Sequence, residues 1–175
     1  ALHPALPKAS VVLFLLFCSL KSRVFSPLNA KRTARVLKDR EIKRPAWTPP
    51  GIAFPIIWST IAILRATSGA MVWQAAGQTA LCAPLAWFMA HLAVGDLWNA
   101  MYTVENRLGA GVVGVLIVLC SVWNVALQYY NTLPMAGYVI LPSALWITVA
   151  TFLVYSIWRL NGSEPLYPFQ EAGDK

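Results

Sequence analysis

Charged residues are scarce in this sequence. Asp, Glu, Lys and Arg make up 12% of its 175 residues, about half of their share in ordinary soluble domains. Hydrophobic residues make up 58%, and the mean hydropathy is +0.57. This composition excludes an ordinary soluble domain. Each membrane-spanning helix needs about 20 apolar residues, so a set of five spans with its loops takes up nearly the whole chain and leaves no room for a second domain.

Cysteines are also few and lie far apart. Cys18, Cys82 and Cys120 lie within apolar runs and form no Cys-x-x-Cys or histidine-linked spacing, the patterns typical of metal and redox sites. We interpret them as buried, inert thiols and predict no metal site. The sequence begins at Ala1 without a Met, which suggests that a targeting segment was removed or left out.

Paired catalytic groups are missing as well. Ser59, Ser68 and Ser121 have no matched partner in the sequence. His91 and Asp96 are five residues apart, which predicts that they diverge around a helix. Because no nucleophile with a base and no pair of carboxylates can be identified, the sequence predicts a protein that is not an enzyme.

Long apolar segments separated by short polar breaks dominate the chain. Four of them cover residues 52–73, 79–102, 109–130 and 138–158. None has a polar face, which excludes a buried soluble helical core, and the short breaks favour an antiparallel bundle. A shorter run, 11–20, spans a membrane if the helix extends over 6–25 and the amino groups of Lys8 and Lys21 reach the headgroups. We therefore predict an all-α integral membrane bundle of five transmembrane helices.

Positive charge lies on one side of this predicted bundle. Only Lys8 lies on the opposite side, and Arg65 lies inside the membrane. By the positive-inside rule the basic side faces the cytoplasm, or the matrix or stroma of an organelle; we expect a plastid thylakoid or mitochondrial membrane rather than the plasma membrane. The other 12 of the 14 Lys and Arg residues lie on the basic side: Lys21, Arg23, Lys31, Arg32, Arg35, Lys38, Arg40, Lys43, Arg44, Arg107, Arg159 and Lys175.

The basic segment 21–44 is a candidate for contact with lipid, and we expect a short amphipathic helix around residues 30–42. A net charge of +7 would also suit nucleic acid, but these charges flank membrane spans and have no exposed aromatic residues between them. The expected partner is therefore the anionic lipid headgroup and not nucleic acid.

Two segments rich in tryptophan and proline stand out. The second span begins with KRPAWTPPGIAFPIIWST at residues 43–60, and the fifth contains PSALW at 142–146 and ATFLVYSIWRLN at 150–161. Prolines are tolerated in the first turn of a helix, whose N–H groups have no partner within the helix. On physical grounds alone, Trp47 suits an interfacial anchor and Trp58, about three turns deeper, suits packing.

These segments resemble motifs of the tryptophan-rich sensory protein/translocator protein (TspO/MBR) family. The family carries Pro-x-Trp-x-Pro-Pro followed by Pro-x-x-Trp, and later Pro-x-x-x-Trp and Ala-Thr-x-Leu-x-Tyr-x-x-Trp-Arg-x-Asn. Trp98 and the Arg-Leu-Gly at 107–109 also fit. The resemblance covers residues 43–161, and its two motifs are jointly hard to reach by chance.

The resemblance implies a five-helix bundle with a pocket that opens toward the loop after the first helix and accepts porphyrins, sterols and aromatic drug-like ligands. Trp58 and Trp146 would be pocket indoles, Trp47 and Pro50 would lie near the mouth, and Trp98 on the opposing wall. Indole rings stack on flat macrocycles, and their N–H groups can reach a carboxylate. The alternative is that the eight tryptophans serve as interfacial belt and packing residues.

By this resemblance the chain divides into three parts. Residues 1–44 hold the first helix and the basic loop, 45–161 hold four family-like helices, and 162–175 form a polar tail. Light-dependent porphyrin breakdown through the pocket tryptophans is compatible with the resemblance but not argued for by it.

The sequence departs from the family pattern at several polar positions. The expected Asn-Trp pair in the third span is Gly95-Asp96, and an expected acid early in the fourth span is Gly114. Expected Tyr and Asn positions in the fifth span are Ser143 and Val154. These changes remove mostly polar ligand contacts, so the scaffold matches the family better than the pocket does.

Charged and titratable groups at membrane depth indicate function. At about 1.5 Å per residue, the levels of Arg65 and Asp96 differ by roughly 12 Å, so a direct pair needs helix tilt or a bridging water. His91 lies nearer the level of Arg65 and has two interpretations. It is either hydrogen-bonded to a neighbouring group, or an axial ligand to the magnesium or iron of a tetrapyrrole, with Arg65 holding a carboxylate or carbonyl of that ligand.

Two weaker patterns concern packing and lipid. Leu153, Tyr155 and Arg159 satisfy a proposed cholesterol-contact pattern that is common by chance. Ala110 and Gly114 have small-xxx-small spacing, which favours close helix contact but indicates no particular homodimer.

Two functions follow from these observations. The first is a membrane protein that binds a tetrapyrrole, a sterol or another flat apolar ligand in its bundle. The alternative is a fixed subunit of a larger membrane assembly, such as a photosynthetic supercomplex, that binds chlorophyll, carotenoid or lipid. Preserved scaffold motifs beside lost polar pocket residues favour this alternative.

Overall fold

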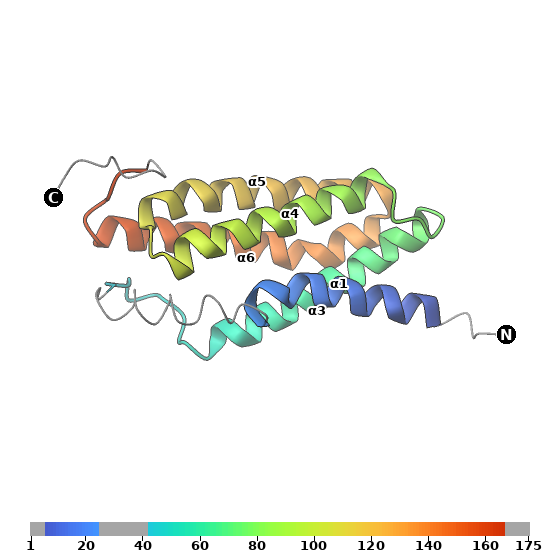
Figure 1. Ribbon diagram of the computed structural model, residues 1–175, viewed down its shortest axis with the longest axis horizontal. Helices are drawn as coiled ribbons and strands as arrows, with labels where there is room; N and C mark the ends of the chain where they lie inside the picture. The colour runs from blue at the N-terminus through green and yellow to red at the C-terminus, as the bar shows by residue number, and fades with distance from the viewer. Residues whose placement is uncertain (1–5, 25–41, 167–175) are drawn as a thin grey trace.

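The computed structural model describes residues 6–24 and 42–166, and these residues form an antiparallel helical bundle (Figure 1). No strand occurs among them, so the predicted all-α class is confirmed. The amphipathic helix expected around 30–42 lies outside the described residues apart from Ile42. The helices are α1 (Leu6–Val24), α3 (Ala53–Ala75), α4 (Ala83–Asn99), the π-helical turn η1 (Ala100–Val104), α5 (Leu108–Thr132) and α6 (Pro134–Leu160).

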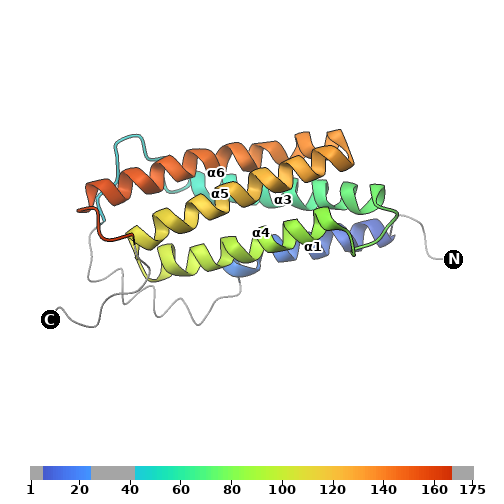
Figure 2. The same cartoon turned by 90° about the horizontal axis from the view of Figure 1, so that it is seen from above.

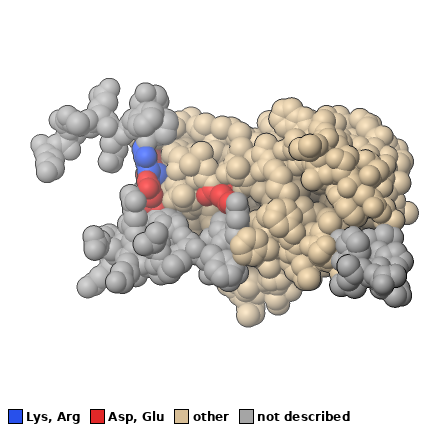
Figure 3. Space-filling model, turned by 45° about the vertical axis from the view of Figure 1, so that its right-hand side comes forward, with Lys and Arg blue, Asp and Glu red and all other residues tan. Residues whose placement is uncertain are grey.

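The length and composition of the helices identify an integral membrane protein. Helices α3, α5 and α6 are each long and apolar enough to cross a membrane. Helix α1 has a shorter apolar stretch, Ala9–Leu20, and α4 has 17 residues before it passes into η1. In the face drawn in Figure 3, the charged side chains of the described residues gather toward one end. Large apolar side chains are exposed on the outer faces of α5 and α6, as lipid requires: Leu116, Ile117, Trp123, Leu127, Leu145, Val149 and Phe152.

Sequence features explain where the helices begin and turn. Proline occupies the first turn of both α4 and α6, where the missing N–H has no cost. The α3–α4 connection contains Gly77 and Gln78, both with positive φ. The α5–α6 hairpin turns through one extended residue, Leu133. A Cβ at Gly137 would lie 2.6 Å from Cβ of Tyr130, so this tight hairpin requires glycine.

The helices follow one another around the bundle in a fixed order. Helix α3 packs against α1 and α6, α6 packs against α5, and α5 packs against α4. Smaller contacts of α4 with α1 and α3 complete the ring. Figures 1 and 2 show that α3 and α5 begin at the same end of the bundle, and that α1, α4 and α6 run in the opposite direction.

Apolar packing closes the end of the bundle where α5 turns into α6. Its largest cluster contains Val72, Phe88, Val125, Tyr129 and Ile140, all fully buried. A smaller cluster with Val118 and Ile147 at its centre packs against Trp58 and Trp98 nearer the other end. Polar and aromatic side chains meet between these two clusters.

Candidate ligand pocket

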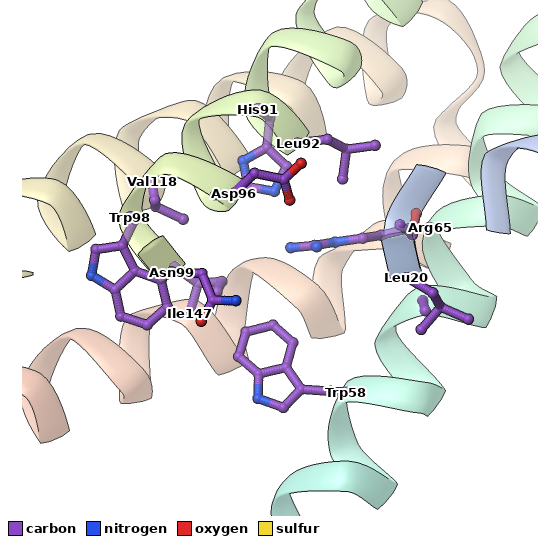
Figure 4. A pocket seen from close by; sticks show the side chains of 13 residues that line it. Leu20, Trp58, Arg65, His91, Leu92, Asp96, Trp98, Asn99, Val118 and Ile147 are labelled. Carbon is purple, nitrogen blue, oxygen red and sulfur yellow. The ribbon is translucent and has the colours of Figure 1, made fainter. Parts of the chain in front are cut away.

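A pocket lies inside the bundle and is bordered by all five α-helices (Figure 4). The centre of a water molecule can occupy about 50 Å³ of it, and the whole hollow, including space open to the surroundings, is about 580 Å³. One water needs about 10–15 Å³ of volume accessible to its centre. The enclosed part of the pocket therefore has room for a few waters. The lining residues are Ser19, Leu20, Trp58, Ala62, Arg65, His91, Leu92, Gly95, Asp96, Trp98, Asn99, Val118 and Ile147.

Arg65 is buried in the pocket wall by contacts with α6. Its side chain is 7% exposed, and its Nε donates a hydrogen bond of 2.8 Å to Oγ of Ser143. Ser143 is fully buried. We interpreted Ser143 from the sequence as a lost ligand contact, which stays a prediction, and the structure shows in addition that it is a partner of Arg65.

Arg65, His91 and Asp96 border the same pocket. Figure 4 shows the Arg65 side chain extended across the pocket toward the other two. Both side chains border one pocket although their levels along the bundle were predicted to differ, and a direct pair between Arg65 and Asp96 stays a prediction. His91 and Asp96 both border the pocket although they are five residues apart, because the pocket extends around a broad face of α4.

His91 is 1% exposed and is hydrogen-bonded to a neighbouring helix. Its Nδ1 lies 2.8 Å from Oγ of Ser121, and Ser121 Oγ donates to the carbonyl oxygen of Val118 at 2.8 Å. The statement that Ser121 has no matched partner is therefore wrong. Sequence reasoning missed the pair because it lies across the α4–α5 packing, 30 residues apart. The hydrogen-bonded interpretation of His91 is confirmed, and its role as a metal ligand stays a prediction.

Trp98 borders the pocket and is fixed against α5. Its Nε1 donates to the carbonyl oxygen of Gly111 at 3.0 Å, and its ring stacks on Tyr102 with centroids 5.2 Å apart and planes 12° apart. A Cβ at Gly114 would lie 2.9 Å from Cδ1 of Trp98, and a Cβ at Gly111 would overlap the ring of Tyr102. Close helix contact was predicted from Ala110 and Gly114. In the structure Gly111 and Gly114 of α5 make this contact with Tyr102 and Trp98.

The predicted aromatic site is only partly assembled at this pocket. Trp58 and Trp98 line it, whereas Trp146 does not. Trp146 packs edge-to-face on Phe54 at 6.4 Å, and its buried Nε1 has no hydrogen-bond partner within the described residues. Trp47 is 51% exposed and, like the exposed Pro50, precedes α3.

Pocket residues that sequence reasoning missed come from α1 and the end of α4. Ser19 and Leu20 lie in the last turns of a helix whose span was marginal in sequence, so no pattern identified them. Asn99 could have been found, because His91, Gly95 and Asn99 repeat every four residues along one face of α4.

The three residues of the sterol-contact pattern do not share one face of α6. Leu153 is buried in the core, whereas Tyr155 and Arg159 are exposed. Sterol contact by these residues stays a prediction.

The later family-like motif residues fix the basic end of the bundle. Lys43 N–H donates to Oδ1 of Asn161 at 3.0 Å, and Asn161 Nδ2 donates to the Lys43 carbonyl oxygen at 2.8 Å. Gly109 N–H donates to Oε1 of Glu164 at 2.7 Å, and Trp158 Nε1 donates to the Glu164 carbonyl oxygen at 2.8 Å. These contacts join the segment before α3 and the start of α5 to the end of α6.

Comparisons with known proteins agree with this architecture. A sequence model described as the TspO/MBR family matches residues 11–159. Protein CrtK of Rhodobacter capsulatus is 33% identical over 127 residues, which are 71% of this chain and 79% of that protein. A tryptophan-rich sensory protein of Cereibacter sphaeroides is 27% identical over 137 residues, 76% of this chain and 85% of that protein. The human translocator protein is 24% identical over 122 residues, 69% of this chain and 72% of that protein.

Proposed function

The chain belongs to the TspO/MBR family, and from this premise we propose that it binds a flat apolar ligand, such as a tetrapyrrole or sterol, within its membrane bundle. The observation that supports this proposal is the pocket between Trp58 and Trp98, with Arg65, His91 and Asp96 at its polar side. Ligand pockets combine apolar and aromatic walls with a few polar groups that fix orientation. Trp58 and Trp98 supply that wall, and Arg65 supplies a cation for a peripheral carboxylate.

Entry of a macrocycle requires an opening between α1 and α4. Room for a few waters is too small for a tetrapyrrole, so one helix must move outward. Helix α1 contributes only Ser19 and Leu20 to the pocket, and its contacts with α4 are much less extensive than those with α3. Outward movement of the C-terminal part of α1 therefore disrupts the least packing.

We propose that α1 and α4 cross the membrane together with α3, α5 and α6. Since α3 and α5 begin at the same end of the bundle (Figure 1), the chain must return to that end between them. Helix α4 with η1 provides this return. Helix α1 has 19 residues, about 28 Å at ~1.5 Å per residue, close to the ~30 Å hydrocarbon thickness.

Ligand binding can be tested with free-base protoporphyrin IX added to the purified protein in detergent. Saturable binding, followed by the absorption and fluorescence of the porphyrin, is expected. Loss of stacking in Trp58→Leu should weaken binding about two- to tenfold, because an aromatic contact contributes about 0.5–1.5 kcal/mol. Trp123→Leu is the matched control, since Trp123 lies on the exposed face of α5. Equal affinities in both variants would place the porphyrin elsewhere.

The alternative function, a fixed subunit of a larger membrane assembly, is favoured by the small closed volume of the pocket. It predicts that the protein stays in stoichiometric amount with a large, pigmented particle after mild solubilisation of its native membrane. A small, colourless particle that binds added porphyrin would instead support the receptor function.

A further inference from the structure

Leu15 seats α1 in a notch of α3 at Gly69. Among the side chains of α1 that the structure describes, only Leu15 is buried, with 3% of its surface exposed. A Cβ at Gly69 would lie 2.8 Å from Cδ1 of Leu15, so a Leu15 methyl group occupies the space that a side chain at residue 69 would take. Leu15 lies at the middle of α1 (Leu6–Val24), on the face by which α1 packs against α3.

The hydroxyl group of Tyr129 lies in the same notch. It would be 3.4 Å from a Cβ at Gly69, and Tyr129 is fully buried in the same apolar cluster as Leu15. Its hydroxyl has no hydrogen-bond partner within the described residues. A hydroxyl buried without a partner destabilises the state that buries it, because water would bond to it. The seated position of α1 therefore has a cost that is recovered when Leu15 leaves the notch.

The pocket wall begins one helical turn after Leu15. Ser19 and Leu20 border the pocket, and Ser19 Oγ donates to the Leu15 carbonyl oxygen at 2.8 Å. Sharp kinks in helices occur mostly at proline or glycine, and α1 has neither after Pro7. The residues from Leu15 to Leu20 therefore move together, so an α1 that leaves the notch also withdraws Ser19 and Leu20 from the pocket wall.

We propose that Leu15, Gly69 and Tyr129 form a latch that holds α1 closed over the pocket, and that the buried Tyr129 hydroxyl weakens this latch so that α1 can open. This inference rests on the proposed function, to which it adds the control of ligand entry. A ligand that enters only the open form binds in proportion to the fraction of molecules that are open. Changes in the latch should therefore change binding although none of its three residues borders the pocket.

Two substitutions should have opposite effects on the rate at which free-base protoporphyrin IX binds to the full chain in detergent. Leu15→Ala removes the side chain that fills the notch and should speed binding about tenfold or more, since burial of a leucine favours the closed form by at least that factor. Tyr129→Phe removes only the hydroxyl group and should slow binding about fivefold or more. In Leu15→Ala the hydroxyl is already hydrated, so adding Tyr129→Phe should have little effect. Leu13→Ala and Tyr130→Phe are the matched controls, because these side chains are 64% and 43% exposed.

A thiol inside the pocket measures opening without a ligand. Gly95 borders the pocket, and a Cβ there meets nothing within 4 Å. The reporter is Gly95→Cys in a protein whose three native cysteines are replaced by Ala. N-ethylmaleimide is larger than the few waters that the closed pocket holds, so it reacts when α1 is open. Its reaction should be faster with Leu15→Ala and slower with Tyr129→Phe.

The outcomes separate the latch from the proposed function. Equal thiol reaction rates in all variants, or a shift in the same direction by Leu15→Ala and Tyr129→Phe, would overturn the latch even if porphyrin binds. Thiol rates that shift as expected in a protein that binds no porphyrin would support the latch and reject the proposed function. If Leu15→Ala does not fold, Tyr129→Phe decides alone, because it removes a single oxygen atom and must slow both reactions.

Discussion

At the scale of single residues, Gly111 and Gly114 determine how closely α4 approaches α5. A methyl group at residue 114 would lie 2.9 Å from Trp98, whose indole cannot turn away without losing its hydrogen bond to Gly111. Gly114→Ala is therefore expected to destabilise the protein by about 1–3 kcal/mol, the range for overpacked interiors. Thermal unfolding in detergent measures this change.

The matched control for Gly114→Ala is Gly95→Ala in the middle of α4. A Cβ at Gly95 meets nothing within 4 Å, and alanine is a better helix former than glycine by about 1 kcal/mol. We expect an unchanged or higher unfolding temperature for this variant. Equal unfolding temperatures for both variants would show that α4 and α5 do not pack as closely as described.

Arg65 and Ser143 are expected to be energetically coupled. Ser143→Ala leaves a buried guanidinium N–H without its acceptor, which should lower the free energy of unfolding by about 1–3 kcal/mol. In an Arg65→Met background the same change should have little effect, because the charge that needed the acceptor is absent. A double-mutant cycle should give a coupling energy of about 0.5–3 kcal/mol.

Ser156→Ala is the control for this cycle. Ser156 also lies on α6, but it is only half-buried and donates to the Phe152 carbonyl of its own helix. Additive effects of Arg65→Met and Ser143→Ala would contradict the described contact.

A pocket residue could be predicted from the sequence only where it stands out within its own helix, without reference to a partner on another helix. Arg65 and His91 were identified because a polar group stands out within an apolar run, and Trp58 and Trp98 were expected at the pocket by resemblance. The partners of Arg65 and His91 were not, because Ser143 and Ser121 are 78 and 30 residues away and meet them only through helix packing. Trp146 was expected at the pocket by resemblance, but α6 presents its neighbour Ile147 instead.

At the scale of elements, the segment before α3 depends on the end of α6. Asn161→Ala removes both hydrogen bonds to the Lys43 backbone. Amide hydrogen exchange in the peptide covering residues 42–50 should accelerate about two- to tenfold, if the lost bonds stabilise the segment by about 0.5–1.5 kcal/mol. Exchange in α5 should not change.

Thr60→Ala is a suitable control for that measurement. Thr60 is exposed on α3 and donates only to the Ile56 carbonyl of its own helix. An unchanged exchange rate at 42–50 in Asn161→Ala would mean that other contacts hold the segment.

Element positions followed closely from the apolar runs. The run 52–73 predicted α3 (Ala53–Ala75), and 109–130 predicted α5 (Leu108–Thr132), because a helix in lipid must satisfy its backbone internally until the polar break. The π-helical turn η1 was not predicted. Its residue Tyr102 lies close against Gly111 of α5.

At the scale of the whole molecule, the arrangement of charge follows the helix directions. The sequence has no charged residue between Arg65 and Asp96 or between Arg107 and Arg159. Both stretches contain the turns at the end opposite Lys43 and Glu164, so these turns carry no charged residue, and Lys8 near the start of α1 is the charged residue of the described helices at that end. The asymmetry predicted from sequence therefore corresponds to the two ends of one bundle.

The five-span topology predicts on which side of the membrane each turn lies. In a protein with Cys18, Cys82 and Cys120 replaced by Ala, single cysteines at Gln78 and Asn131 should react with a membrane-impermeant maleimide from one side only. Cysteines at Lys43 and Leu166 should react from the other, because all four side chains are exposed in connections or ends of helices.

Helix α1 is tested by a cysteine at Ser10, near its start and exposed. If α1 crosses the membrane, Ser10→Cys reacts from the side of Gln78, since α1 and α3 run in opposite directions (Figure 2). Reaction from the side of Lys43 would mean that α1 lies along the membrane surface, and the pocket wall formed by Ser19 and Leu20 would then have to come from another segment. Because α1 is also the element that must move for a macrocycle to enter, its topology determines whether the pocket has an entrance from within the bilayer.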